Sequence, residues 1–192
     1  MIKLHFLYKA LMDIIYPNQY SACNKVISHN NFPICFGCIA SIPKSNFSCF
    51  IENPIKQKLY DIPNLKYCLS IYKYQKNNLT QLLIHKLKYQ SNKKIGKFFG
   101  AQIAKTLIDN NIKIDFLVPV PMYKTKEKTR GYNQTNIIAF ELAKIINTPV
   151  LDMLQKINNT ESQTKKAYIK GDITKRKNLE LVSPLSLVEN IC

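Results

Sequence analysis

The sequence predicts an α/β protein with a parallel sheet, preceded by a small cysteine-rich module. The first observation is the order strand, loop, helix, strand over residues 115–154, which is typical of a parallel α/β unit. The second is that residues 17–56 carry four cysteines and four prolines but few periodic apolar residues. The third is that apolar residues recur at helical spacing in three segments, residues 79–89, 93–110 and 134–146.

The N-terminal part, residues 1–56, is expected to hold one helix and the cysteine-rich module. Residues 3–16 have apolar positions near helical spacing, and Pro17 ends that helix. Residues 17–56 cannot build a hydrophobic core unaided, which is the situation that a structural metal ion solves. Residues 57–192 then form the α/β domain.

Each element of the α/β domain follows from a local pattern. Alternating apolar side chains predict a strand over residues 65–71. Asn78 and Gln81 match a capping box for the helix at residues 79–89, and a second helix follows at residues 93–110.

The rest of the domain is expected to be a strand, a loop, a helix and a strand. Residues 115–120 are apolar and partly β-branched, which predicts a strand, with a flexible loop over residues 121–132. Asn133 is the expected N-cap of a helix at residues 134–146, and residues 150–154 form the next strand. The loop occupies the carboxyl end of its strand, where ligands of parallel sheets bind.

The charge of the chain has two interpretations. Its 28 Lys and Arg residues exceed its 12 Asp and Glu residues, for a net charge of +16, and only Arg130 and Arg176 are arginines. One interpretation is a lysine-coated surface exposed to solvent. The other is a surface that binds a polyanion such as single-stranded DNA, because lysines interleaved with an aromatic ring suit that ligand. The residues in question are Lys86, Lys88, Lys93, Lys94 and Lys97, with Tyr89. A second basic group crowds the tail: Lys165, Lys166, Lys170, Lys175, Arg176 and Lys177.

The sequence also bears on localisation. No apolar run reaches the roughly 18 residues of a transmembrane helix, so we expect no membrane insertion. Residues 2–16 are interrupted by charges and lack the cleavage site of a signal peptide, so we expect a cytoplasmic protein.

The cysteines suggest a zinc site. Cys35 and Cys38 form a C-x2-C pair with Gly37 permitting the tight turn, and a tetrahedral site needs two further ligands. Cys23 and Cys49 are the candidates, with His29 a weaker alternative to Cys49. The competing interpretation is a set of reduced thiols without metal.

Residues 118–134 suggest an anion site. Pro119 and Pro121 stiffen the exit from the strand, and a cluster of basic residues follows. Gly131 permits a close approach of the backbone to a ligand, and the next helix presents its free N–H groups. The competing interpretation is a solvated basic loop with an ordinary N-cap. The candidate ligand-binding residues here are Arg130, Gly131, Asn133 and Gln134.

Two short motifs within residues 118–134 together resemble the ComF/GntX family of phosphoribosyltransferase-like proteins. They are the P-V-P of residues 119–121 and the R-G-Y-N-Q of residues 130–134, which opens a helix. Supporting similarities cover most of the chain: the L-K-Y of residues 87–89, Gln163, the K-R-K-N of residues 175–178, and the P-N-Q of residues 17–19. Tyr20 stands where the family has a further cysteine.

The resemblance implies a type I phosphoribosyltransferase fold behind a zinc-binding module, and a role in natural competence. It implies that Lys88 and the segment from Arg130 to Gln134 border a site for phosphoribosyl diphosphate. The family's acidic pair followed by a T-T-G loop does not occur in this sequence, so we expect an incomplete, C-terminally truncated domain.

The expected function is therefore that of a ComF-like accessory protein in DNA uptake, and we assign no catalytic residue. Single-stranded DNA and other competence proteins, such as a helicase, are the expected partners. The alternative is a phosphoribosyltransferase that uses phosphoribosyl diphosphate and a nucleobase-like substrate, this chain being a fragment of it.

Overall fold

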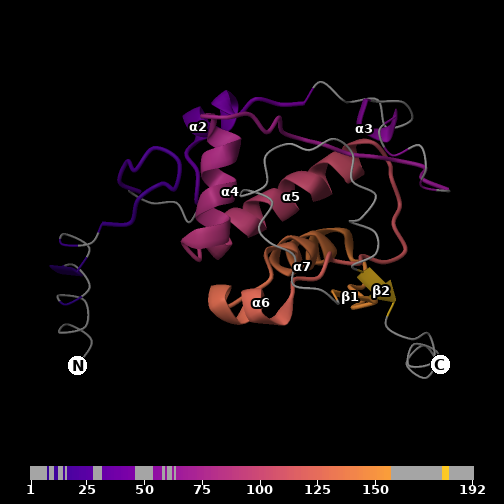
Figure 1. Ribbon diagram of the computed structural model, residues 1–192. Coiled ribbons are helices and arrows are strands. Elements are labelled where there is room, and N and C mark those ends of the chain that lie inside the picture. The colour runs from indigo at the N-terminus through magenta and orange to yellow at the C-terminus, as the bar shows by residue number, and fades with distance from the viewer. Residues whose placement is uncertain are drawn as a thin grey trace. The chain divides into compact units, whose positions relative to one another are not determined.

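The computed structural model describes residues 17–27, 32–45, 54–57, 64–156 and 179–181, with residues 8, 11, 12, 15, 59 and 62 (Figure 1). The helix predicted over residues 3–16 falls largely outside this part of the chain. The chain divides into two compact units, residues 1–95 and 96–192, and each is described by itself. The domain boundary predicted between residues 56 and 57 stays a prediction.

In the first unit, a tight reversal of the chain and a short helix form the cysteine-bearing region. Gln19 and Val26 pair in an antiparallel bridge, so the chain reverses between them. Helix α2 (Phe36–Ser41) follows a short segment that bends at residues 33 and 34. Ile34 and Ile42 flank α2 and are only 1% and 2% exposed, so they anchor this region.

Two further helices belong to the first unit. Helix α3 (Pro54–Gln57) is a single turn, and α4 (Leu79–Tyr89) has the bounds that the sequence predicts. The side chain of Asn78 accepts the N–H of Gln81 at 2.9 Å, which confirms Asn78 as the N-cap. The buried side chains of α4 are Thr80, Leu83 and Leu87.

The strand predicted over residues 65–71 does not form as a regular strand. Among the described residues, the nearest pairing is one antiparallel bridge between Tyr72 and Lys44. Two backbone hydrogen bonds support that bridge, from Ser45 N–H to Ile71 O and from Lys73 N–H to Pro43 O. The prediction of a regular strand over residues 65–71 is therefore wrong, and the burial of these residues does not alternate.

Two long helices supply the core of the second unit. Helix α5 (Lys93–Asp109) begins just before the unit does, and α7 (Gln134–Ile146) follows later in the chain (Figure 1). Both confirm the predicted helices, α5 ending one residue earlier than expected. Side chains from both helices meet in one buried cluster of Ala104, Leu107 and Leu142.

The two helices approach closely at a glycine. A Cβ added at Gly100 would lie 2.6 Å from the carbonyl oxygen of Ile138 and 2.9 Å from the Cβ of Glu141. The absence of a side chain at Gly100 therefore lets the backbone of α7 pack directly against α5.

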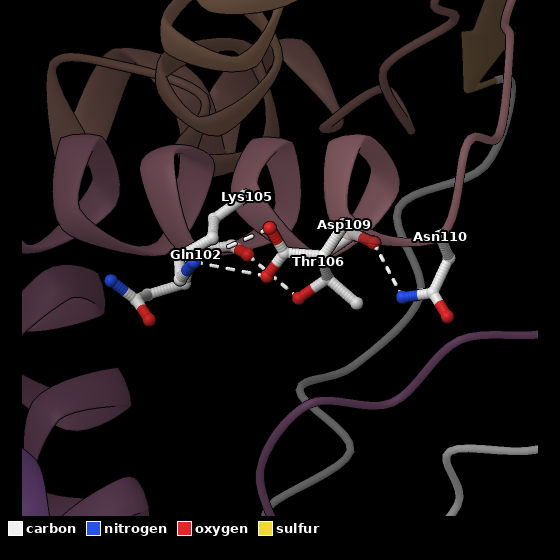
Figure 2. A network of polar contacts seen from close by, with 5 residues as sticks. All are labelled: Gln102, Lys105, Thr106, Asp109 and Asn110. Carbon is white, nitrogen blue, oxygen red and sulfur yellow. Dashed lines mark hydrogen bonds and ion pairs between the residues drawn. The ribbon is translucent and has the colours of Figure 1, made fainter.

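The opposite side of α5 carries a network of polar contacts (Figure 2). Lys105 and Asp109 form an ion pair of 3.0 Å one helical turn apart. The Thr106 hydroxyl donates to the carbonyl of Gln102, and the Asn110 amide donates to the carbonyl of Thr106. Asn110 thereby satisfies one of the carbonyls left unpaired at the C-terminus of α5.

The expected parallel sheet is reduced to one bridge in the described residues. Leu117 and Val150 pair in parallel, with hydrogen bonds from Leu117 N–H to Pro149 O and from Leu151 N–H to Leu117 O. The next donor along a parallel ladder would be residue 119, and Pro119 has no N–H. The prediction of strands at residues 115–120 and 150–154 is therefore too long, because a proline ends the pairing.

The prediction of a flexible loop over residues 121–132 is also partly wrong, because most of this segment is helical. Helix α6 (Lys124–Arg130) fills it and buries none of its residues. Lysine, glutamate and arginine are good helix formers, so the segment forms a helix without an apolar face. Gly131 ends α6 in the left-handed conformation, with φ of 79°.

A short antiparallel pair completes the second unit. Strand β1 (Leu154–Lys156) pairs with β2 (Leu179–Leu181), Gln155 lying opposite Glu180. The described chain is thus mixed and mainly helical. None of its helices combines the length and the apolar character needed to cross a bilayer.

The packing at Gly100 predicts a stability effect. In Gly100→Ala the overlap with α7 outweighs the gain in helix propensity of about 1 kcal/mol. We expect the free energy of unfolding to fall by about 1–2 kcal/mol, measured by urea denaturation followed by circular dichroism. Gly37→Ala is the control, because a Cβ there meets nothing within 4 Å. Equal stability of the two variants would contradict the close packing of α5 on α7.

Candidate functional site

Three cysteine sulfurs converge in the first unit. Cys23 lies in the turn of the chain reversal, Cys35 is the N-cap of α2, and Cys38 lies in the first turn of α2. Their Sγ atoms all lie within 4.8 Å of one another, and those of Cys23 and Cys35 are 3.7 Å apart. We call these three residues the cysteine cluster.

The local backbone prepares one of these sulfurs to carry a negative charge. The N–H of Cys38 donates to the Sγ of Cys35 at 3.4 Å. This hydrogen bond is the main reason that the pKa of the Cys35 thiol lies below its ordinary value. Burial is the main cause at Cys38, where the nearby sulfurs of Cys35 and Cys23 add to it and the pKa rises to about 12. Without a cation, the Cys35 thiol therefore ionises more readily than the Cys38 thiol.

The cluster has the dimensions of a metal site. Zn–S bonds of about 2.3 Å in a tetrahedron place neighbouring sulfurs about 3.8 Å apart. The 3.7 Å between Cys23 and Cys35 matches that edge. A bound divalent cation would also deprotonate the thiols outright, including that of Cys38, whose pKa is raised when no cation is bound. These three cysteines could therefore bind a metal ion. The other expected ligands, Cys49 and His29, lie outside the described residues.

The segment that resembles the family's R-G-Y-N-Q forms a sharp turn between α6 and α7. Gly131 takes the left-handed conformation, Tyr132 is buried, and Asn133 caps α7 by accepting the N–H of Thr135 at 3.1 Å. Burial raises the pKa of the Tyr132 phenol.

The amide of Asn133 also donates to Val120 O at 3.0 Å, and the Thr135 hydroxyl donates to the same carbonyl at 2.6 Å. Asn133 therefore fixes the start of α7 to the end of the segment that pairs with Val150.

Arg130 is held within this turn. Its Nη1 donates to Gln134 Oε1 at 3.2 Å, and the Tyr132 ring between them in sequence is buried. Gln134 is itself buried, and its Nε2 has no hydrogen-bond partner among the described residues. A buried amide donor without a partner is costly, which marks this atom as a place for a further acceptor.

A cavity of about 530 Å³ opens beside the turn in the second unit. It lies just after the two segments that pair at Leu117 and Val150, at the start of α6 and of α7. Five of its polar lining residues are amides or cations, and two are carboxylates. They are Asn133, Asn136, Gln155, Lys124, Lys156, Glu127 and Asp152.

The structure brings together some of the expected site residues and not others. Arg130, Gly131, Asn133 and Gln134 share one turn, but of these four only Asn133 lines the cavity. Lys88 is half-buried on α4 of the other unit. Lys124 was expected within the basic cluster of the anion site, whereas Asp152 and Lys156 were missed; their position after the expected strands was the available signal.

Comparison of the chain with protein-family models, with curated proteins and with solved structures found no match. The resemblance to the ComF/GntX family therefore rests on the quoted residues alone and stays a prediction.

The pKa values of the cluster predict an order of thiol reactivity. In reduced, metal-free protein at pH 8, Cys35 carries more thiolate than Cys38, whose pKa is about 12. We expect iodoacetamide to modify Cys38 roughly tenfold or more slowly than Cys35, measured by peptide mass spectrometry after timed quenching. In urea the two rates should converge. Equal rates in the folded protein would mean that the hydrogen bond to Cys35 and the burial of Cys38 are absent in solution.

Proposed function

We propose that this protein is a ComF-like accessory protein in DNA uptake during natural transformation. In this proposal the cysteine cluster holds zinc, and the second unit is an incomplete phosphoribosyltransferase-like domain. Single-stranded DNA is the proposed ligand, and other competence proteins, such as a helicase, are the proposed protein partners.

The observation that carries the proposal is the turn from Arg130 to Gln134. This is the most specific part of the resemblance. Gly131 ends α6 in the left-handed conformation and Asn133 caps α7, so both residues have a structural reason to be there. Asn133 also lines the cavity, which follows the parallel bridge, where ligands of α/β domains bind.

Zinc is proposed on the chemistry of the donors. Three thiols with a C-x2-C pair favour a soft or borderline cation over magnesium or calcium, which prefer oxygen ligands. Cys23, Cys35 and Cys38 would be the protein ligands, with Cys49 as the proposed fourth. The metal would fix the turn at Cys23 to the start of α2.

Single-stranded DNA is proposed on the exposed cations and rings of the first unit. Lys93 and Lys94 are exposed at the start of α5, and Tyr89 is exposed at the end of α4. The rings of Tyr89 and His85 lie 4.7 Å apart, so two rings are presented together on α4. Lysines that track phosphates, beside rings on which bases stack, suit a single strand.

A second candidate is a phosphoribosyltransferase of which this chain is part. The observation in its favour is the cavity, which offers Lys124, Lys156 and three side-chain amides to an anionic ligand. The acidic pair and T-T-G loop that would hold phosphoribosyl diphosphate are absent from the sequence, so we derive no catalytic step. Saturable binding of phosphoribosyl diphosphate without DNA binding would favour this candidate.

The DNA proposal is tested by fluorescence anisotropy with a labelled single-stranded oligonucleotide across a salt series. We expect sequence-independent binding that weakens steeply with salt. The double variant Lys93→Gln with Lys94→Gln should lower the slope of log K against log salt by about 1–1.5, because two phosphate contacts are lost.

The matched control removes two lysines of the second unit, Lys105→Gln with Lys113→Gln. Lys105 is paired with Asp109 and Lys113 is exposed, so this double variant changes the net charge equally. The control should leave the slope nearly unchanged. Equal losses in both variants, or no binding at low salt, would contradict a DNA surface at Lys93 and Lys94.

A further inference from the structure

Two sulfurs of the cysteine cluster are already in contact without being bonded. The Sγ atoms of Cys23 and Cys35 lie 3.7 Å apart, and both residues are half-buried, so a small oxidant can reach them. They come from different segments, 12 positions apart in sequence. Cys38 is the third member of the cluster.

We propose that Cys23 and Cys35 form a reversible disulfide on exposure to peroxide, and that this disulfide and a bound metal exclude each other. The first clause stands on the sulfur contact alone. The second clause rests on the proposed function, because it concerns the metal that the cluster would hold. The cluster is then a redox-sensitive site as well as a structural one.

The chemistry balances with hydrogen peroxide as the oxidant. The sulfur of one cysteine attacks a peroxide oxygen, the O–O bond breaks, and a sulfenic acid and one water form. The second sulfur attacks the sulfenic sulfur, the S–S bond forms and a second water leaves. The two thiols lose two protons and two electrons, and the peroxide is reduced to two waters. A dithiol reductant reverses the step.

The geometry favours this pair and explains the exclusion of metal. A shift of less than 2 Å brings the two sulfurs from 3.7 Å to the bonding distance of about 2.05 Å. Once they are bonded, neither sulfur is a thiolate. Cys38 is then the one thiolate donor left in the cluster, which cannot hold a tetrahedral ion.

The test uses the full chain in two forms, reduced and metal-free, and loaded with one equivalent of zinc. Each form is treated with hydrogen peroxide, and the linked cysteines are mapped by peptide mass spectrometry without reduction. Zinc release is followed with a chromogenic indicator. In the metal-free form we expect a loss of about 2 Da and a Cys23–Cys35 linked peptide. In the loaded form we expect roughly tenfold slower oxidation, with zinc released in step with the disulfide.

Three variants serve as comparisons. Cys38→Ser keeps both sulfurs of the pair and should still give the Cys23–Cys35 link. Cys23→Ser should give no such link and should keep its mass under the same treatment. Cys68→Ser removes a half-buried cysteine outside the cluster and should behave as the unsubstituted chain.

Each outcome tests one part of the proposal, either the disulfide or its exclusion of the metal. A link that maps to Cys35 and Cys38, or no link in the metal-free protein and in Cys38→Ser, overturns the disulfide. Zinc that stays bound after the link has formed overturns the exclusion. A chain that binds no zinc but forms the link sinks the proposed metal and leaves the disulfide standing.

Discussion

The cysteine-bearing region of the first unit depends on the convergence of Cys23, Cys35 and Cys38. Of the large apolar side chains that the described residues of this unit bury, Ile34 and Ile42 flank α2, whereas Leu83 and Leu87 belong to α4 and Ile95 to the start of α5. The cysteine cluster joins the turn at Cys23 to the start of α2. A metal ion held by the cluster would stabilise that junction, because metal binding to such a site is itself folding free energy.

The second unit is held by different means. Two helices pack directly through Gly100, and the parallel bridge between Leu117 and Val150 places two chain segments side by side. Asn133 then joins the end of the first segment to the start of α7. The cavity lies beside this junction, and the residues that line it come from separate parts of the sequence, residues 121–136 and 152–156.

The helices α4 and α7 could be predicted to the residue, because their signals are local. Asn78 and Asn133 mark the starts, and apolar periodicity marks the lengths. Helix α6 was missed for the opposite reason: it buries no residue, so periodicity had nothing to detect. The parallel sheet was overestimated because an apolar, β-branched run does not reveal that Pro119 removes the next donor of the ladder.

The candidate sites show the same difference between features with a local sequence signal and features that depend on distant parts of the chain. The C-x2-C pair and the N-cap at Asn133 are visible within a few residues, and both take the geometry that their spacing indicates. Cys23 was a candidate ligand from its nearness in sequence, and it does join the pair. The chain reversal that brings it there, with the Gln19–Val26 bridge, is not encoded by a short pattern. Lys124, Asp152 and Lys156 share a cavity only because the chain folds back through α7.

The most direct test of the cysteine cluster is X-ray absorption at the zinc edge, on protein purified with its metal. The account predicts stoichiometric zinc with a shell of at least three sulfurs at about 2.3 Å, and loss of that shell in Cys35→Ser. Cys68→Ser should retain the sulfur shell. A shell made only of nitrogen and oxygen at about 2.0–2.1 Å, or a folded protein without stoichiometric metal, would contradict it.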